Sequence, residues 1–266
     1  MKYFDKNNSR LVFQEARSDP DFWDKLWRSD DLKKEILKGK KDRFVSRITK
    51  KFIPPSRSNR IIEGGCGKGQ FVYSLSLCGY DAYGVDYAKK TIEKINLTMP
   101  DLKISCQDVR KMNFPDNFFD GYWSLGVIEH FYEGYDKIVK EAKRVIKPGG
   151  YLFLTFPYMS PLRKIKAKLG LYPVFDKNKF QTDFFYQFAL NHKNVTAHFA
   201  RSGFTLIEKM PLDGIKGLKD EIVVFKPVLQ KIYGRDKFVL KVISKMISLV
   251  FSNVSGHSML IILKKR

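Results

Sequence analysis

The spacing of apolar residues divides the chain into a helical beginning and a longer part in which strands and helices alternate. Near the beginning, apolar residues recur at helical spacing in two clusters, namely Phe22, Trp23, Leu26 and Trp27, and then Phe44, Val45, Ile48 and Phe52. Pro54 and Pro55 end this segment, because a proline cannot donate the backbone hydrogen bond that a helix needs. Residues 1–53 are therefore predicted to be helical, and residues 1–55 to form an N-terminal cap or lid.

Beyond residue 55, short apolar runs of strand length alternate with segments of helix length. The predicted strands are residues 60–63, 82–86, 103–107, 119–124, 151–156, 205–209 and 258–263, and the predicted helices are 70–78, 88–96 and 135–145. The sequence "KPGG", residues 147–150, predicts a helix stop and a sharp turn before the fifth strand. Such alternation favours an α/β fold, with a mostly parallel sheet covered by helices on both faces.

Two segments do not fit a minimal alternation of strands and helices. They are residues 157–181 and residues 211–257, and the second lies between the last two predicted strands. In this architecture, insertions after the carboxyl ends of strands lie where ligands bind. Residues 56–266 are therefore predicted to form one domain, in which the two insertions make the side that receives a substrate.

Composition limits the classes of partner. The chain has 266 residues, 44% hydrophobic and 29% charged, as in a globular protein that can bury a full core. Its formal net charge of +21 fits either surface lysines that aid solubility or an anionic partner, whether nucleic acid, an acidic substrate or an anionic membrane surface. Cys66, Cys78 and Cys106 form no C-x-x-C pair, so neither a disulfide framework nor a zinc site is indicated.

Targeting signals are not recognisable in the sequence. The start "MKYFDKNNSR" has no apolar run of a secretory signal, and no stretch of eighteen apolar residues could span a membrane. A reducing cytoplasmic location is therefore expected, with peripheral contact at the inner membrane face as an extension of it.

The stretch "IIEGGCGKGQF", residues 61–71, places four glycines after a predicted strand, a position at which glycine loops usually hold phosphate. The P-loop template fails, because it needs a glycine at Ile62 and a hydroxyl at Gly69. The dinucleotide fingerprint also fails, because it needs a glycine at Gln70. Neither phosphate template therefore explains the loop.

A third template, acid-x-G-x-G-x-G, is satisfied by Glu63, Gly65, Gly67 and Gly69. A carboxylate at the strand end would repel a pyrophosphate and favour a cation, such as an amino group beside a sulfonium. The glycines still allow the backbone to approach the ligand closely. Glu63 is thus the informative residue, and Lys68 is expected to point to solvent.

Two further acids follow the next predicted strands. Asp86 ends its strand about twenty residues after the loop, where an acid can accept both hydroxyls of a ribose. Asp108 could accept from an adenine amino group, with Val109 and Met112 against the ring, although a strand-end aspartate is often only a turn cap. Three acids at successive strand ends predict a site for a cationic nucleoside.

With these features the sequence resembles the class I S-adenosylmethionine-dependent methyltransferases, of the type 11 kind. The resemblance rests on "IIEGGCGKGQF", "AYGVDYAKKTIEKI", "QDVRKMNFPDNFFDGYWSLGVIEHF" and "EAKRVIKPGGYLFLTFP", which together cover roughly residues 58–157. It implies a Rossmann-like seven-stranded sheet whose last strand is antiparallel, and S-adenosyl-L-methionine as cofactor. The cofactor-binding residues that it implies are Glu63, Gly64, Gly65, Cys66, Gly67, Gly69, Asp86, Tyr87, Asp108, Val109, Ser124 and Leu125.

The segment "SLGVIEHF" follows the fourth strand, and in related methyltransferases it passes under the methyl group. His130 is therefore the candidate base or acceptor-orienting residue; the alternative is that Glu129 and His130 simply open the next helix. Some relatives bind a divalent metal here through E-x-x-E-H, but Gly126 replaces the first acid, so no metal is predicted. For Trp23 and Trp27, packing on the core is the first interpretation and a lid over the cofactor is the alternative.

Residues 238–254 are apolar around most of a helix, with Lys241, Lys245, Ser248 and Ser252 on one stripe. A helix buried against the sheet or against a dimer partner is the first interpretation, and a helix at a membrane surface is the second. The sequence thus predicts methyl transfer to a small-molecule or lipid-linked acceptor such as a glycan, lipid or quinone, at oxygen. RNA methylation, or a binding module without catalysis, stays open as an alternative.

Overall fold

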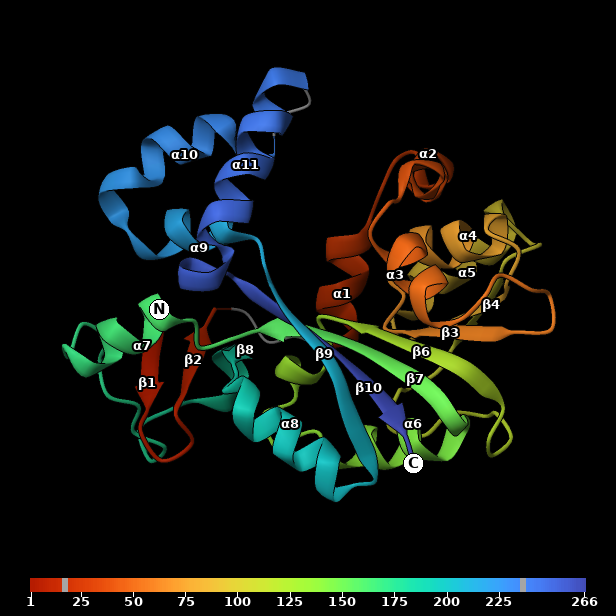
Figure 1. The fold of residues 1–266 in the computed structure, drawn as a ribbon, viewed down its shortest axis with the longest axis horizontal. Coiled ribbons are helices and arrows are strands. Elements are labelled where there is room, and N and C mark those ends of the chain that lie inside the picture. Colours follow the sequence, from red (N-terminus) through yellow and green to blue (C-terminus); the bar gives the residue numbers. More distant parts are fainter. Residues whose placement is uncertain (16–18, 235–237) are drawn as a thin grey trace.

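The computed structural model describes residues 1–15, 19–234 and 238–266, and its centre is a seven-stranded sheet (Figure 1). In sheet order the strands are β5 (Lys103–Cys106), β4 (Asp81–Asp86), β3 (Arg60–Gly64), β6 (Phe119–Leu125), β7 (Ile146–Pro157), β10 (Ser258–Lys265) and β9 (Phe204–Leu212). Pairs from β5 to β7 are parallel, whereas β10 is antiparallel to both of its neighbours. The predicted fold class and the antiparallel last strand are confirmed.

Helices cover both faces of this sheet. One face carries α2 (Leu32–Leu37), α3 (Val45–Phe52), α4 (Gln70–Leu77) and α5 (Lys89–Thr98), and the other carries α6 (Asp136–Val145) and α8 (His192–Arg201) (Figure 1). Neighbouring residues of a strand enter different cores: Ile61 packs on the first face and Ile62 on the second. A strand buried on both faces reads as a continuous apolar run, which is why β3 and β7 were recognisable in the sequence.

The first residues correct the sequence-based prediction. Residues 1–53 were expected to be helical, but β1 (Lys2–Asp5) and β2 (Arg10–Gln14) form a hairpin that pairs with β8 (Phe185–Ala189) in a second, antiparallel sheet. The strand that stabilises the hairpin lies far away in the sequence, so local spacing could not reveal it. Helices begin only with α1 (Pro20–Trp27), followed by α2, the short 3₁₀ helix η1 (Lys38–Lys41) and α3.

The segment "KPGG" also differs from its prediction. Helix α6 does end just before it, but β7 already begins at Ile146, and the pairing with β6 shifts register between Phe119 and Gly121. The glycines therefore make an irregular start of the strand rather than a separate turn before it.

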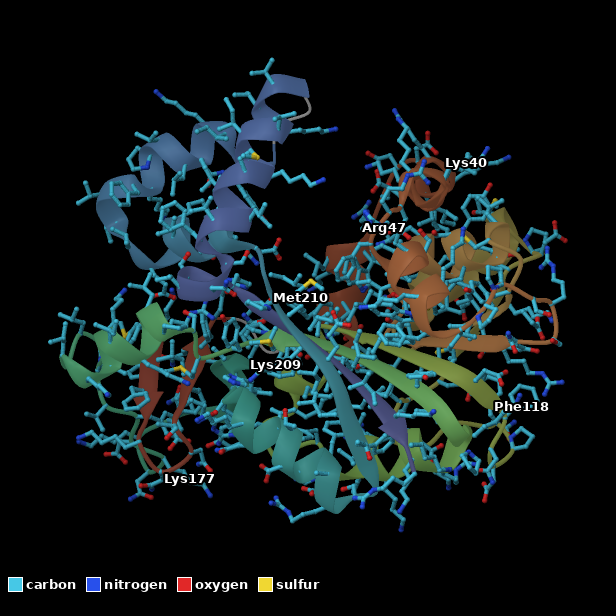
Figure 2. All side chains as sticks on the ribbon, in the orientation of Figure 1. Lys40, Arg47, Phe118, Lys177, Lys209 and Met210 are labelled. Carbon is cyan, nitrogen blue, oxygen red and sulfur yellow. The ribbon has the colours of Figure 1, made fainter. Side chains whose placement is uncertain are left out.

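The two insertions build structure beside the sheet. The first contains α7 (Pro161–Lys168) and is followed by the 3₁₀ turn η3 (Thr182–Phe184). The second contains α9 (Gly214–Glu221), η4 (Val223–Phe225), α10 (Lys226–Ile232) and α11 (Phe238–Ser255). Helices α9 to α11 form an arm that stands away from the sheet (Figure 1), and Figure 2 shows side chains projecting all around α10 and α11. The expectation that residues 238–254 lie buried against the sheet is wrong, since α11 packs on α9 and leaves most of its apolar side chains exposed.

Candidate functional site

The glycine loop lies between β3 and α4 and folds back on the end of β4. The backbone N–H groups of Gly65 and Cys66 donate to the Val85 carbonyl oxygen at 2.8 and 3.0 Å, and the Gly67 N–H donates to Asp86 Oδ2 at 2.9 Å. Gly65 and Gly67 have φ of 75° and 50°, a region that side chains with a Cβ avoid. The loop and the Asp86 carboxylate are therefore held as one unit.

Glu63 lies beneath this loop and is only 2% exposed. Its Oε2 has no hydrogen-bond partner in the described part of the chain. Burial raises the pKa of the carboxyl group well above its usual range, and the nearby charges of Asp86 and Asp42 raise it further. A buried acid with one oxygen that lacks a partner, at the wall of a cavity, fits a cationic group of a ligand and does not fit a phosphate.

Asp86 and Asp108 differ in the partners that their carboxylates already have. Asp86 Oδ1 accepts from the Ala88 N–H at 2.9 Å, and burial raises the pKa of the carboxyl group although these backbone donors oppose the shift. Each oxygen keeps a second lone pair that could accept from a ribose hydroxyl. Asp108 instead forms a forked ion pair with Arg110, at 2.9 and 3.0 Å from its Nε, so an adenine contact at Asp108 would share the carboxylate with that arginine.

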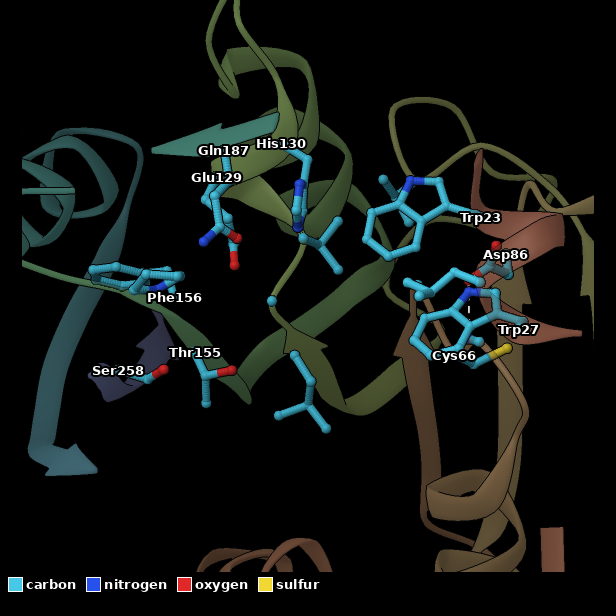
Figure 3. A pocket seen from close by; sticks show the side chains of 18 of the residues that line it. Trp23, Trp27, Cys66, Asp86, Glu129, His130, Thr155, Phe156, Gln187 and Ser258 are labelled. Atoms are coloured by element: carbon cyan, nitrogen blue, oxygen red, sulfur yellow. Dashed lines mark hydrogen bonds between the residues drawn. The ribbon is translucent and has the colours of Figure 1, made fainter. Parts of the chain in front are cut away.

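These residues line a cavity of about 550 Å³ (Figure 3). It extends from Glu63 and Asp86 to Lys216 and His257 of the second insertion. Of the predicted cofactor residues, those that line it are Glu63, Gly65, Cys66, Gly67, Asp86, Tyr87, Asp108, Val109 and Leu125. The structure does not place Gly64, Gly69 and Ser124 in the lining. Gly64 packs on Tyr122, whose hydroxyl would lie 2.0 Å from an added Cβ, Gly69 begins α4, and the Ser124 hydroxyl is buried without a partner among the described residues.

Lys68 corrects another expectation, because it does not point to solvent. It lines the cavity, its side chain is 18% exposed, and its Nζ lies 3.6 Å from Glu35 Oε2. This lysine thus joins the loop to α2, and its charge is not held ready for a phosphate.

Helix α1 covers the cofactor end of the cavity. The indoles of Trp23 and Trp27 stack with centroids 5.6 Å apart, and a Cβ on Gly67 would lie 3.1 Å from the Trp27 ring. Figure 3 shows both indoles beside Asp86. The Asp24 carboxylate accepts from the Thr91 N–H and hydroxyl at 2.8 Å, which ties α1 to α5. None of the eight residues of α1, all of them described, is buried, and Trp23 and Trp27 line the cavity and not the core. A lid over the cofactor stays a prediction.

His130 lies in the 3₁₀ turn η2 (Ile128–His130), near the middle of the cavity wall. Its Nδ1 is 2.8 Å from the Tyr186 carbonyl oxygen, so Nδ1 carries the proton and Nε2 carries the lone pair. Burial lowers the pKa of the imidazole to about 4, and the ring packs edge-on against Trp23 at 4.9 Å between centroids. His130 is therefore a neutral, weakly basic acceptor, suited to orient a hydroxyl more than to remove its proton.

Glu129, the residue before it, has the complementary property. It is buried, its Oε2 has no hydrogen-bond partner among the described residues, and it lines the same cavity. Burial raises its pKa to about 8, while the Lys216 charge acts in the opposite direction. A carboxylate with a pKa near the working pH is a competent general base, and sequence reasoning had assigned this chemistry only to His130.

The end of the cavity away from α1 comes from β7, β10 and the arm. Lys216 of α9 donates from Nζ to His257 Nε2 at 2.9 Å, and burial lowers the pKa of Lys216. Behind His257, the fully buried Arg163 forms an ion pair with Glu221 at 2.9 Å between Nε and Oε1. Sequence reasoning missed these residues, because they come from both insertions and meet only in three dimensions.

Comparison with known proteins places the cofactor half of this site in a family. A family model described as "Methyltransferase domain" matches residues 62–154, which run from β3 to β7 and include Glu63, Asp86 and Glu129. Over these residues the chain is therefore similar to a methyltransferase domain. S-adenosyl-L-methionine is the cofactor of such domains, and the buried Glu63, whose Oε2 lacks a partner among the described residues, fits its positive charge.

Individual relatives agree with this placement. Residues of the chain are 33% identical over 106 positions to 2-methyl-6-phytyl-1,4-hydroquinone methyltransferase of Synechocystis sp., covering 38% of this chain and 32% of that protein. They are 29% identical over 136 positions to the mitochondrial ubiquinone biosynthesis O-methyltransferase of Dictyostelium discoideum, covering 46% of this chain and 42% of that protein. The chain thus spans less than half the length of either relative.

A solved structure shows the same fold over nearly the whole chain. The complex between the Haloferax volcanii Trm112 methyltransferase activator and a putative methyltransferase contains a chain with a TM-score of 0.56 and 14% identity, covering 91% of this chain and 97% of that one. Within the described residues, no group of three or more histidine, cysteine, aspartate or glutamate side chains could hold a metal ion.

Proposed function

We propose that this protein transfers a methyl group from S-adenosyl-L-methionine to a hydroxyl group of a small-molecule or lipid-linked acceptor. The observation that carries the proposal is the polarity of the single cavity. Buried acids that suit a cationic nucleoside lie at one end, the base Glu129 and the hydrogen-bond acceptor His130 lie near the middle, and Lys216 lies at the other end.

Each residue of the site has a proposed role in this reaction. Glu63 and the glycine loop hold the charged part of the cofactor, Asp86 accepts from its ribose, and Trp23 and Trp27 exclude water from above. When bound, the cofactor supplies a methyl carbon activated by its sulfonium. His130 Nε2 accepts from the acceptor hydroxyl and orients it, and Glu129 takes the proton as the oxygen attacks.

The two insertions, residues 157–181 and 211–257, are proposed to form the acceptor side of the domain. Lys216, Asp220, His257 and Ser258 line that end, and Thr155, Phe156 and Tyr186 supply its apolar wall. The quinone-related names of the two relatives support an aromatic or prenylated acceptor, although those names describe the relatives and the identities are modest.

Calorimetric titration with S-adenosylmethionine and S-adenosylhomocysteine tests the cofactor half, and Glu63→Ala is expected to abolish binding. The acceptor half is tested by methyl transfer from labelled S-adenosylmethionine into lipid, glycan and RNA fractions of a cell extract, with Glu129→Gln as the inactive control. Label in the lipid or glycan fraction that requires Glu129 supports the proposal. Label in the RNA fraction, with RNA binding that weakens steeply with salt, would instead support the RNA alternative.

A further inference from the structure

Helix α11 turns its serines toward the protein and its apolar side chains outward, which is the reverse of a helix that packs on a core. Its serines face the protein: Ser252 Oγ accepts from the Gly214 N–H at 3.2 Å, and Ser248 Oγ accepts from the Ile215 N–H at 3.3 Å. Ser255 Oγ donates to the Gly214 carbonyl oxygen at 2.9 Å. These hydroxyls supply partners to the first turn of α9, which has no side-chain cap of its own. The serines of the polar stripe seen in the sequence therefore lie on the inner side of the helix, whereas Lys241 and Lys245 of the same stripe are exposed.

The apolar face of α11 is the outer one. At 3.6 residues per turn, Val239, Val242, Met246 and Val250 share a stripe on the side opposite to Ser248. All four side chains are exposed, and Val250 and its neighbour Leu249 reach 64% and 72% exposure. Ordinary surface helices bury this stripe, so α11 presents an apolar face that nothing in the described chain covers.

The neighbouring turns of the arm extend this face. Val223, Val224 and Phe225 of η4 and Val228 of α10 are exposed as well, and Val223 is 82% exposed. Helix α10 packs against α11 and α9, so these residues belong to the same arm. We call the exposed apolar side chains of η4, α10 and α11 the arm face.

The charge of the residues around the arm face indicates what kind of partner it binds. Between residues 222 and 257 the sequence has six basic residues and a single acid, Asp236; the basic residues are Lys226, Lys231, Arg235, Lys237, Lys241 and Lys245. Residues 235–237 lie outside the described part of the chain. Lys226 and Lys231 are exposed on α10, beside the arm face, and Lys241 and Lys245 are exposed on the serine side of α11. A second copy of the chain paired on this face would bring like charges together, whereas an anionic lipid surface complements them.

We propose that the arm face docks on the surface of an anionic membrane, with its apolar side chains in the headgroup boundary and the neighbouring α10 lysines, Lys226 and Lys231, among the lipid phosphates. Among the described residues, no helix combines the length and apolar composition needed to cross a bilayer, so docking is peripheral. Helix α9, on which α11 packs, also contributes Lys216 and Asp220 to the cavity. Docking thus brings the acceptor end of the cavity close to the bilayer; this last step rests on the proposed function.

Vesicle flotation tests the docking. The unaltered protein is expected to float with vesicles of equimolar phosphatidylcholine and phosphatidylglycerol, and to float far less with phosphatidylcholine alone or at high salt. The double variant Val242→Glu/Met246→Glu is expected to lower the partition coefficient by about tenfold or more, because it places two charges in the docked face. The matched control, Leu77→Glu/Leu97→Glu, adds the same charges at exposed sites on α4 and α5, where Leu97 is 86% exposed, and is expected to keep most of the binding.

Three outcomes would overturn the docking proposal. The first is that the unaltered protein does not float with vesicles, and the second is that both double variants lose vesicle binding equally. The third is that the unaltered protein binds no vesicles but sediments as a dimer, which only Val242→Glu/Met246→Glu disrupts. The last outcome would assign the arm face to a second copy. Circular dichroism shows whether the variants fold. Cofactor titration of the same samples keeps the two proposals apart, since loss of cofactor binding concerns the proposed function alone.

Discussion

Replacing Glu63 with glutamine is expected to change cofactor affinity and protein stability in opposite directions. The substitution keeps the size of the side chain and removes its ability to become negative. In the free protein the buried carboxyl group has a raised pKa and Oε2 has no hydrogen-bond partner among the described residues, so the negative form is disfavoured there. With a bound cation beside it, the negative form becomes the favoured one.

The magnitude follows from the interaction that is lost. A hydrogen bond to a charged partner contributes about 1.5–3 kcal/mol, which corresponds to about 10- to 150-fold weaker binding of S-adenosylmethionine by Glu63→Gln. For stability the sign is reversed. An acid whose pKa is raised in the folded state binds its proton more tightly there than in the unfolded chain, so its effect destabilises the fold once the pH exceeds the unfolded pKa. Near neutral pH, Glu63→Gln is therefore expected to be at least as stable as the unaltered protein.

Isothermal titration calorimetry and urea unfolding measure the two quantities on the same samples. Because the bound cation lowers the pKa of Glu63, cofactor binding is also expected to release up to about one proton, read from the dependence of the heat on the buffer. Glu93→Gln on the exposed face of α5 is the matched control and should leave affinity and stability unchanged. Unchanged affinity of Glu63→Gln would refute the assignment of the loop to a cationic ligand.

The remaining predictions concern the acceptor base, the lid and the buried ion pair. Because burial raises the pKa of Glu129 to about 8, the turnover rate should rise with pH through that value and then level. Glu129→Gln should lower the turnover rate by about 100-fold or more and remove its pH dependence. The same pH dependence in the variant would exclude Glu129 as the base. Trp27→Ala should weaken cofactor binding by about tenfold with little change in stability, since Trp27 is not buried; an equal loss of both would mean that it packs as core. Glu221→Gln should lower the free energy of unfolding by about 3 kcal/mol in urea, because it leaves Arg163 buried without its ion pair. Burial alone would raise the pKa of Glu221, but the Arg163 and Lys2 charges hold this pKa at about 2. The stabilisation should therefore be present above the unfolded pKa and fade as the pH falls toward 2. A decrease in the free energy of unfolding of less than about 0.5 kcal/mol at neutral pH would contradict this prediction.

The sequence was informative where a feature is local. The apolar runs of β3, β4 and β7, the glycine loop and the acids Glu63 and Asp86 all depend on residues within one strand-and-turn unit. The strands are confirmed by the sheet, and Glu63 and Asp86 line the cavity, while their cofactor contacts stay predictions. The resemblance to a methyltransferase family supplied the antiparallel β10, which periodicity alone does not give.

The features that the sequence could not give depend on distant partners. The hairpin of β1 and β2 forms because β8 is available some 170 residues later in the chain, as the pairing of Val12 with Phe188 illustrates. The direction in which Lys68 points is decided by Glu35 on α2. The outward apolar face of α11 results from the serine contacts with α9, and amphipathic spacing alone says which residues share a face but not which way the face turns.

The most direct test of the central claim is calorimetric titration of the unaltered protein with S-adenosylmethionine and with S-adenosylhomocysteine. The account predicts that both bind at one site per chain and that binding of S-adenosylmethionine is lost or strongly weakened when Glu63 is replaced. Binding of neither compound by the folded protein would contradict the claim that this cavity holds the methyl donor.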